Sequence, residues 1–263
     1  MGSFYSQNEG EFIYRDVSLT GGTSATIYDK NINRLDLETG LSENLEEITT
    51  REISDMATRE QKGIIIETKS SQNATKQVLE DYLGYNLTQK NSSFEFTGST
   101  LGESFYRQLL LAILFAFIFM AIVVFILFKK LIPSTAVIVS AFADIFMTLV
   151  VVNMLGVKMS IAGIVSFLML IGYSVDTDIL LTTRLIKRRA KGLNNRIFEA
   201  FKTGITMTLT SLVAILVALF FVKSISPTLT QMFSILAIGL GFDILNTWIT
   251  NVSLLKWSLK NEN

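Results

Sequence analysis

The sequence predicts an α-helical membrane bundle that carries a small external α+β domain. The 263 residues have a mean hydropathy of +0.43, but the apolar residues are concentrated after Tyr106. Of the 23 basic and 23 acidic residues, 9 and 17 lie in residues 1–105, which leaves 14 and 6 for residues 106–263. The two parts therefore carry about −8 and +8, as expected when one lies in water and the other places cations at a lipid surface. This balance does not indicate nucleic-acid binding.

Five apolar stretches predict the membrane domain, residues 106–263. Each is close to the roughly 20 residues that a helix needs to cross the hydrocarbon core. Runs of this length are poor candidates for helices in a soluble core. We expect the five helices near 106–128, 133–155, 160–185, 203–222 and 228–250.

The cations in the short connections predict the orientation. Eleven lie on one side and only Lys158 and Lys223 on the other, so we expect the first side to face the cytoplasm and residues 1–105 to lie outside the cell membrane. The eleven are Lys129, Lys130, Arg184, Lys187, Arg188, Arg189, Lys191, Arg196, Lys202, Lys256 and Lys260. A translocated domain needs a targeting segment, and the opening MGSFYSQNEGEF is not apolar. We therefore expect a first transmembrane helix to precede this sequence in the natural protein.

The external part reads as a small ferredoxin-like α+β domain. A strand-like run over 15–28 is broken by Gly21 and Gly22, which predict a turn or bulge in preference to an anion site. We expect a helix over 42–61 that opens at Ser42, a β-branched strand over 63–68, a helix over 73–83 and a strand over 94–96. The order β-α-β-α-β places helices on one face of a sheet.

Residue types restrict the chemistry. The chain has no Cys and no His, so thiolate chemistry and the commonest metal ligand are lacking. Residues 1–105 offer no nucleophile with a plausible base and no phosphate loop, and we expect no metal, no cofactor and no enzymatic activity. Proton handling must fall to carboxylates. Three Asn-X-Ser/Thr sequences, at Asn73, Asn86 and Asn91, could carry glycans, and the alternative is chance occurrence in an Asn- and Thr-rich segment.

Four aspartates within the predicted spans are the candidates for ion coupling: Asp144, Asp176, Asp178 and Asp243. Ionisable groups in a bilayer are costly and usually mark function. Asp176 and Asp178 are about 200° apart on a helix, so they cannot both face one neighbour.

Two alternatives compete with ion coupling. A buried Asp can simply bond to a neighbouring helix, and the fourth span offers the hydroxyls of Thr203, Thr206, Thr208, Thr210 and Ser211. Asp178 could instead be solvated at the interface beside Arg184.

Several motifs resemble the archaeal SecF branch of the SecD/SecF family of protein-export subunits, within the resistance-nodulation-division superfamily. The segment Gly172-Tyr173-Ser174-Val175-Asp176-Thr177-Asp178, which continues to Arg184, is similar to the fourth-helix signature of that branch. The Gly21-Gly22 pair resembles the motif after its first helix, the Gly98 to Gly102 segment resembles the motif that closes its external domain, and Asp144 lies where its third helix carries an acid.

The resemblance implies a six-helix half of a transporter fold, of which five spans are present. It also implies a non-enzymatic accessory subunit that acts with SecD and assists the SecY translocon. Its spans would contact membrane lipid, its external domain would engage the translocating polypeptide, and an ion gradient would drive it.

The bacterial pattern is not fully matched. Its acid corresponds to Thr177 and its fifth-helix Arg to Thr206. Ion coupling is therefore a hypothesis here, with two rival functions: a purely structural partner of SecD, and a small-molecule or lipid exporter subunit. Intramembrane aspartyl proteolysis is a more distant rival, because Asp176 and Asp178 on opposite helix faces cannot form the required dyad.

Overall fold

The structure is a computed structural model that describes residues 14–54, 58, 60–187, 192–223 and 225–261. The predicted helix over 42–61 and the cations Arg188, Arg189 and Lys191 lie partly or wholly outside the described residues. The chain divides into two compact units. One unit comprises residues 1–108 with the short segments Lys158–Ile161 and Val222–Pro227, and the other comprises the rest of the chain.

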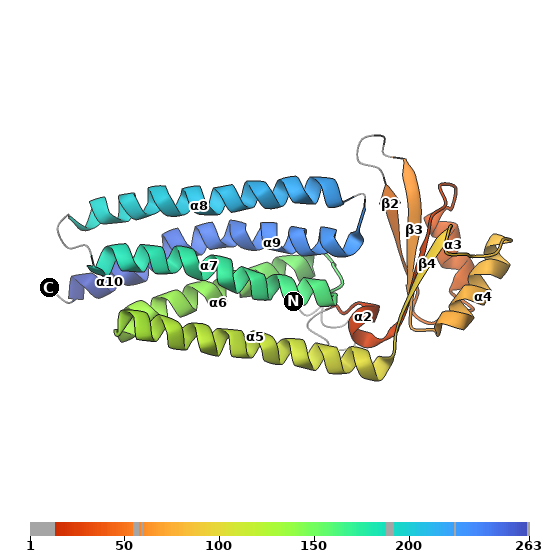
Figure 1. The fold of residues 1–263 in the computed structure, drawn as a ribbon, viewed down its shortest axis with the longest axis horizontal. Coiled ribbons are helices and arrows are strands. Elements are labelled where there is room, and N and C mark those ends of the chain that lie inside the picture. The colour runs from red at the N-terminus through yellow and green to blue at the C-terminus, as the bar shows by residue number, and fades with distance from the viewer. Residues whose placement is uncertain (1–13, 55–57, 59, 188–191, 224, 262–263) are drawn as a thin grey trace. The chain divides into compact units, whose positions relative to one another are not determined.

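The first unit contains a four-stranded sheet (Figure 1). Its strands are β1 (Gly22–Ile27), β2 (Thr49–Ser54), β3 (Gln61–Thr68) and β4 (Ser92–Thr97), in the spatial order β2-β3-β1-β4. All neighbouring strands are antiparallel. The helices are α2 (Val17–Thr20), α3 (Arg34–Leu41) and α4 (Gln72–Leu83). The series β-α-β-β-α-β in this order confirms the ferredoxin-like prediction.

Two local predictions are wrong. There is no helix over the described residues of 42–61: the helix is α3, which Asn33 caps at its start by accepting from the N–H of Leu35, and Ser42 is its C-cap. The β-branched Thr49, Thr50 and Ile53 then form β2, because pairing with β3 satisfies their backbone groups. The run over 15–28 is interrupted at Gly21, but its first part is not a strand, because Asp16 caps the single turn α2 there and only β1 is extended.

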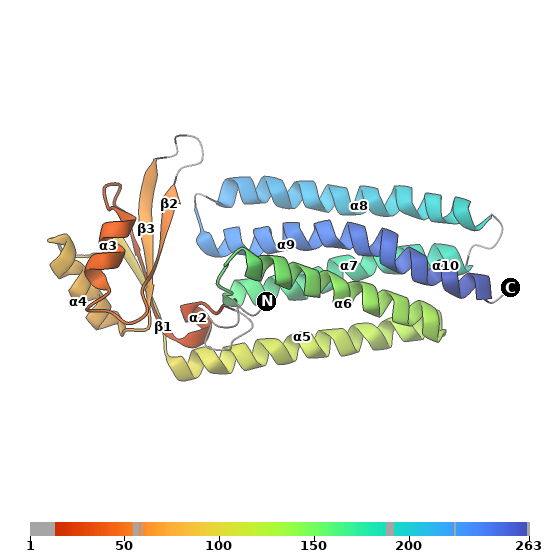
Figure 2. The same cartoon turned by 180° about the vertical axis from the view of Figure 1, so that it is seen from behind.

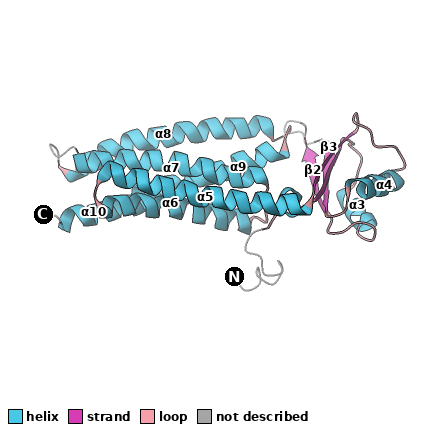
Figure 3. Ribbon diagram, turned by 60° about the horizontal axis from the view of Figure 1, so that its bottom comes forward, coloured by secondary structure: helices cyan, strands magenta, loops and turns pink. Residues whose placement is uncertain are grey.

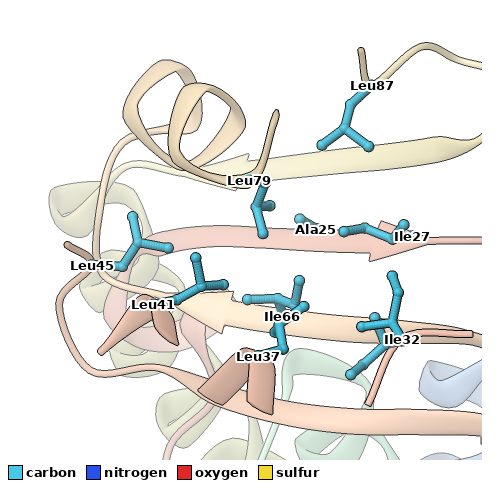
Figure 4. Close-up of a cluster of buried hydrophobic side chains, with 10 residues drawn as sticks. Ala25, Ile27, Ile32, Leu37, Leu41, Leu45, Ile66, Leu79 and Leu87 are labelled. Carbon is cyan, nitrogen blue, oxygen red and sulfur yellow. The ribbon is translucent and has the colours of Figure 1, made fainter. Parts of the chain in front are cut away.

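A compact apolar core holds α3 and α4 on the sheet. Figure 4 shows side chains from both helices meeting those of the strands and loops. Fully buried aliphatic groups alternate along β1, where Ala25 and Ile27 face inward with Ile64 and Ile66 of β3. The remaining members of this core are Ile32, Leu37, Leu41, Leu45, Leu79 and Leu87.

The second unit is a helical bundle without strands in its described residues (Figure 3). Five helices of the described chain are long and apolar enough to span a membrane, which confirms the predicted number. They are α5 (Ser99–Phe128), α6 (Leu131–Met154), α7 (Ile161–Lys187), α8 (Leu193–Val222) and α9 (Pro227–Leu245). The last continues through the π-helix η1 (Asn246–Asn251) into α10 (Val252–Asn261).

Helix α7 is the most buried of the five spans and lies at the centre of the bundle's packing. Its apolar side chains take part in three clusters: Ile171 packs with α5 and α6, Leu181 and Leu185 pack with α6, α8 and α10, and Leu170 packs with α8 and α9. Polar residues carried by α7 are therefore held by neighbours on most sides.

Glycines bring the start of α5 against the segment before β1, within the first unit. Gly21 has φ +87°, and an added Cβ would lie 2.3 Å from Cα of Ser99. An added Cβ on Gly102 would lie 2.9 Å from the Gly21 nitrogen. The two glycine motifs, about 80 residues apart in the sequence, are thus one packing contact between backbones.

We expect Gly102→Ala and Gly21→Ala to destabilise the protein by about 1–3 kcal/mol each, because backbone atoms cannot yield to a methyl group. The matched control is Gly98→Ala, where no atom lies within 4 Å of an added Cβ, and it should change stability by less than about 0.5 kcal/mol. Thermal unfolding of the full chain in detergent would measure this. Equal effects of Gly102→Ala and Gly98→Ala would contradict the contact.

Candidate functional site

Three aspartates from three different helices meet inside the bundle. Asp144 lies on α6, Asp178 on α7 and Asp243 on α9, and all three are fully buried. We call these three residues the acid cluster. Figure 2 shows that α6, α7 and α9 belong to the same bundle, and a shared donor, Thr247, connects Asp178 with Asp243.

Asp144 is bonded on both oxygens. The hydroxyl of Ser174, one turn before Asp178 on α7, donates to Oδ2, and Nδ2 of Asn246 donates to Oδ1 at 2.7 Å. Asp144 thereby joins α6 to α7 and to the π-helix η1.

Asp178 receives its donors on one oxygen. Nδ2 of Asn251 donates to Oδ1 at 2.7 Å, the hydroxyl of Thr247 at 2.9 Å and the hydroxyl of Ser140 at 3.3 Å. The other oxygen, Oδ2, is buried and has no hydrogen-bond partner among the described residues. Buried polar atoms are usually hydrogen-bonded. The unpaired carboxyl oxygen in a bilayer span therefore indicates that Asp178 does more than join neighbouring helices.

Asp243 is linked to Asp178 through Thr247. The hydroxyl of Thr247 lies 3.3 Å from Oδ1 of Asp243 and 2.9 Å from Oδ1 of Asp178. On the other side, the hydroxyl of Thr208 on α8 lies 3.4 Å from Oδ2 of Asp243, and Thr177 lies 3.4 Å from Thr208. A chain of hydroxyls and carboxyls therefore runs from α7 and α8 to the centre of the cluster.

The π-helix η1 places the amide donors. Asn246 and Asn251 are five residues apart, which on an α-helix would separate their directions by about 140°. In η1 both reach the acid cluster, and Thr247 reaches it as well. Such widened turns often occur at functional sites. The sequence analysis missed these three donors, although polar residues in an apolar span were a signal that could have identified them.

Within the described residues, the hydrogen-bond partners of the three carboxyls are amides and hydroxyls, and no Lys or Arg bonds to them. Arg184 does not pair with Asp178: it donates to the carbonyl of Glu199 at 2.6 Å. No group of three or more acidic residues in the described chain is arranged to hold a metal ion.

Asp176 is not a member of the cluster. Its side chain is exposed on α7, one face away from the buried Asp178. Met169, Gly172, Tyr173 and Asp176 form an exposed stripe with the helical spacing i, i+3, i+4, i+7, which we call the α7 stripe. Of the two aspartates in the signature, only Asp178 meets Asp144 and Asp243.

The other predicted residues lie elsewhere. Thr206 and Thr210 are exposed, and their hydroxyls donate to carbonyls of their own helix, those of Lys202 and Thr206; Ser211 is partly buried.

Of the three possible glycosylation sites, Asn73 and Asn86 are exposed, whereas Nδ2 of Asn91, the atom that a glycan would modify, donates to the carbonyl of Asn86 at 3.0 Å. Gly21, Gly22, Gly98 and Gly102 lie at or near the contact between α5 and the segment before β1.

Comparison with known proteins finds a family model and several relatives that match this chain. The family model described as "Protein export membrane protein SecD/SecF, C-terminal" matches residues 78–261. A protein-export membrane protein SecF of Methanocaldococcus jannaschii is 39% identical over 93% of this chain and 87% of its own length. The SecF of Methanothermobacter thermautotrophicus is 37% identical over 93% and 84%.

The fold is also that of a solved structure. The crystal structure of SecDF, a translocon-associated membrane protein from Thermus thermophilus, matches 99% of this chain with a TM-score of 0.78 at 20% identity. This chain spans 36% of the length of that protein. From the match over most of its length to the family model and to archaeal relatives, the chain belongs to the SecD/SecF family of protein-export membrane proteins, in its SecF branch.

Proposed function

We propose that this chain is a non-enzymatic accessory subunit of protein export that acts with SecD and draws on a transmembrane ion gradient through the acid cluster. The observation that supports this most directly is the meeting of Asp144, Asp178 and Asp243 in the interior of a membrane bundle. Carboxyls at this depth are costly, and they persist where they carry ions or protons.

The hydroxyl of Thr247 supports a role in proton handling. A threonine has one hydroxyl proton, so it can donate to only one of two carboxylates at a time. Both Asp178 and Asp243 lie within hydrogen-bond distance of it. The arrangement is complete when one of the two carboxyls carries a proton and donates it to the threonine oxygen. Moving that proton exchanges donor and acceptor without moving the helices.

The proposed orientation follows the cation count. The α5–α6 connection, the ends of α7 and α8 that approach each other, and the end of α10 lie at one end of the bundle (Figure 2). Lys129, Lys130 and Arg184 belong to this end, so we propose that it faces the cytoplasm and that the sheet of the first unit lies outside. There the sheet could engage a polypeptide that emerges from the SecY translocon.

The first prediction for the cluster is that Asp178→Asn and Asp243→Asn each reduce gradient-dependent export at least about tenfold, because an amide cannot bind and release the proton. Co-purification of SecD should be retained, since Asn keeps the size and can hydrogen-bond to the same neighbours. The measurement is translocation of a secreted protein into membrane vesicles with and without an imposed ion gradient.

The matched control for these variants is Asp81→Asn, at an exposed position on α4, which should export normally. If Asp178→Asn, Asp243→Asn and their double variant all export like the control, ion coupling by the cluster is refuted. The chain would then be a structural partner of SecD, whose acids serve only to join helices.

A second prediction concerns Thr247. Thr247→Val keeps the shape of the side chain but removes the hydroxyl between Asp178 and Asp243, so export should fall several-fold. Thr210→Val is the matched control, because that hydroxyl bonds only to the carbonyl of Thr206 in the described structure. Equal export by the two variants would argue against a hydroxyl link between the carboxyls.

The α7 stripe supports pairing with SecD. Lipid tails cannot hydrogen-bond, so the exposed Asp176 carboxyl and Tyr173 hydroxyl would remain unsatisfied against them. Gly172, whose added Cβ would meet no atom within 4 Å, leaves room for the close approach of another helix. The exposed face of α8, by contrast, is apolar at Val213, Val217 and Phe220, which suits contact with lipid.

A photo-crosslinking residue in place of Tyr173 should therefore form an adduct with SecD in native membranes. The same residue in place of Phe220, on the apolar face of α8, is the control and should react mainly with lipid. Gel shifts of the tagged chain measure both. Strong SecD adducts from the control together with none from position 173 would place the partner on another face.

A further inference from the structure

A charged cluster in the first unit ties the sheet to the connection between α6 and α7. It comprises Asp16, Arg51, Glu67 and Lys158, which we call the connector cluster. These residues come from the segment before β1, from β2, from β3 and from the α6–α7 connection. None of them belongs to the acid cluster, and the sequence analysis used only Lys158, as one cation in the count that predicts the orientation.

The α6–α7 connection is held first by its backbone. Met159 forms an isolated parallel bridge with Arg15: its carbonyl accepts from the N–H of Asp16 at 2.9 Å, and its N–H donates to the carbonyl of Tyr14 at 2.6 Å. The N–H of Ile161, the first residue of α7, donates to the hydroxyl of Ser18 at 3.4 Å. Residues 158–161 accordingly belong to the same compact unit as the sheet.

Asp16 carries this attachment to the sheet. Its N–H bonds to Met159, one carboxylate oxygen accepts from the N–H of Ser18, and the other lies 3.4 Å from a guanidinium nitrogen of Arg51 on β2. The same guanidinium nitrogen pairs with the carboxylate of Glu67 on β3. Arg51 therefore lies between two largely buried carboxylates and pairs with both.

Lys158 completes the connection from the other side. Its ammonium donates to the hydroxyl of Thr49 at 2.6 Å, and Thr49 lies opposite Glu67 in the ladder between β2 and β3. Burial raises the pKa of Glu67, and the charge of Asp16 raises it further, while Arg51 and Lys158 act in the opposite direction. Lys158 thus interacts electrostatically with Glu67 and bonds to Thr49, the residue that lies opposite Glu67 on the neighbouring strand.

Such a network is a weak source of stability, because desolvation offsets much of the attraction between buried charges. Its effect is to fix position: removing Arg51 would leave two carboxylates without their shared cation. The connection that it positions leads directly into α7, which carries Ser174 and Asp178 of the site.

We propose that the connector cluster fixes the α6–α7 connection, and with it the first residue of α7, to the external sheet, and that export needs this attachment. This inference rests on the proposed ion coupling for its purpose, but the attachment itself can be tested without export. In it Arg51 is a positioning residue that acts through Asp16 on the α6–α7 connection.

The attachment is tested by a single cysteine. The chain has no cysteine of its own. Met159→Cys, at a position 2% exposed, would therefore report how often the α6–α7 connection detaches and exposes this residue to solvent. In the full chain, adding Arg51→Gln should speed maleimide labelling of this cysteine at least about tenfold, the effect of losing a charged hydrogen bond. Arg34→Gln, which breaks the exposed ion pair with Glu38 on α3, is the matched control and should leave the rate unchanged. An unchanged rate in Arg51→Gln would overturn the proposal.

The need for this attachment in export is tested by rescue, which also separates a lost attachment from a misfolded protein. Arg51→Gln should reduce export, and a disulfide between Arg15→Cys and Met159→Cys should restore at least half of it. Bridged neighbours lie about 4.8 Å apart, within the span of a disulfide. Reductant should remove the rescue in the same sample. Faster labelling with normal export, or a formed disulfide without rescue, would refute the need for this attachment in export and leave the acid cluster untouched.

Discussion

The structure depends on one constraint: a carboxyl buried in a membrane bundle must find its hydrogen-bond donors inside that bundle. Asp144, Asp178 and Asp243 meet this constraint with donors from four elements, and two of those donors, Asn246 and Asn251, come from a stretch that has given up α-helical spacing. A widened turn weakens the local helix. It persists here because it satisfies two acids that lipid could not solvate.

The sequence predicts the acids of the site better than their partners. Residue type alone singled out Asp144, Asp178 and Asp243 together with Asp176, since carboxyls are rare in apolar spans. Helical spacing also showed that Asp176 and Asp178 face different ways, but not which one faces inward. That choice is made by tertiary packing: α7 is covered by α6, α8, α9 and α10 on the side of Asp178. The amides of η1 could not be assigned, because α-helical spacing places them on different faces.

In the external domain as well, local sequence patterns predict some elements, while tertiary contacts decide others. The β-branched run of β3 and the helical pattern of α4 are strong local signals, and both were predicted within two residues. A serine and several acids that favour a helix start, from Ser42 to Glu47, precede β2, yet no helix begins there and the next residues form the strand. Its pairing with β3 and the contact of Arg51 with Glu67 exist only in the folded sheet, so a local pattern cannot contain them.

The division into two units does not coincide with the division between sheet and spans. Residues 158–161 and 222–227 connect membrane helices, yet they belong to the unit that contains the sheet. The first of these segments is fixed to the sheet through Asp16, and it leads into the helix that carries Ser174 and Asp178.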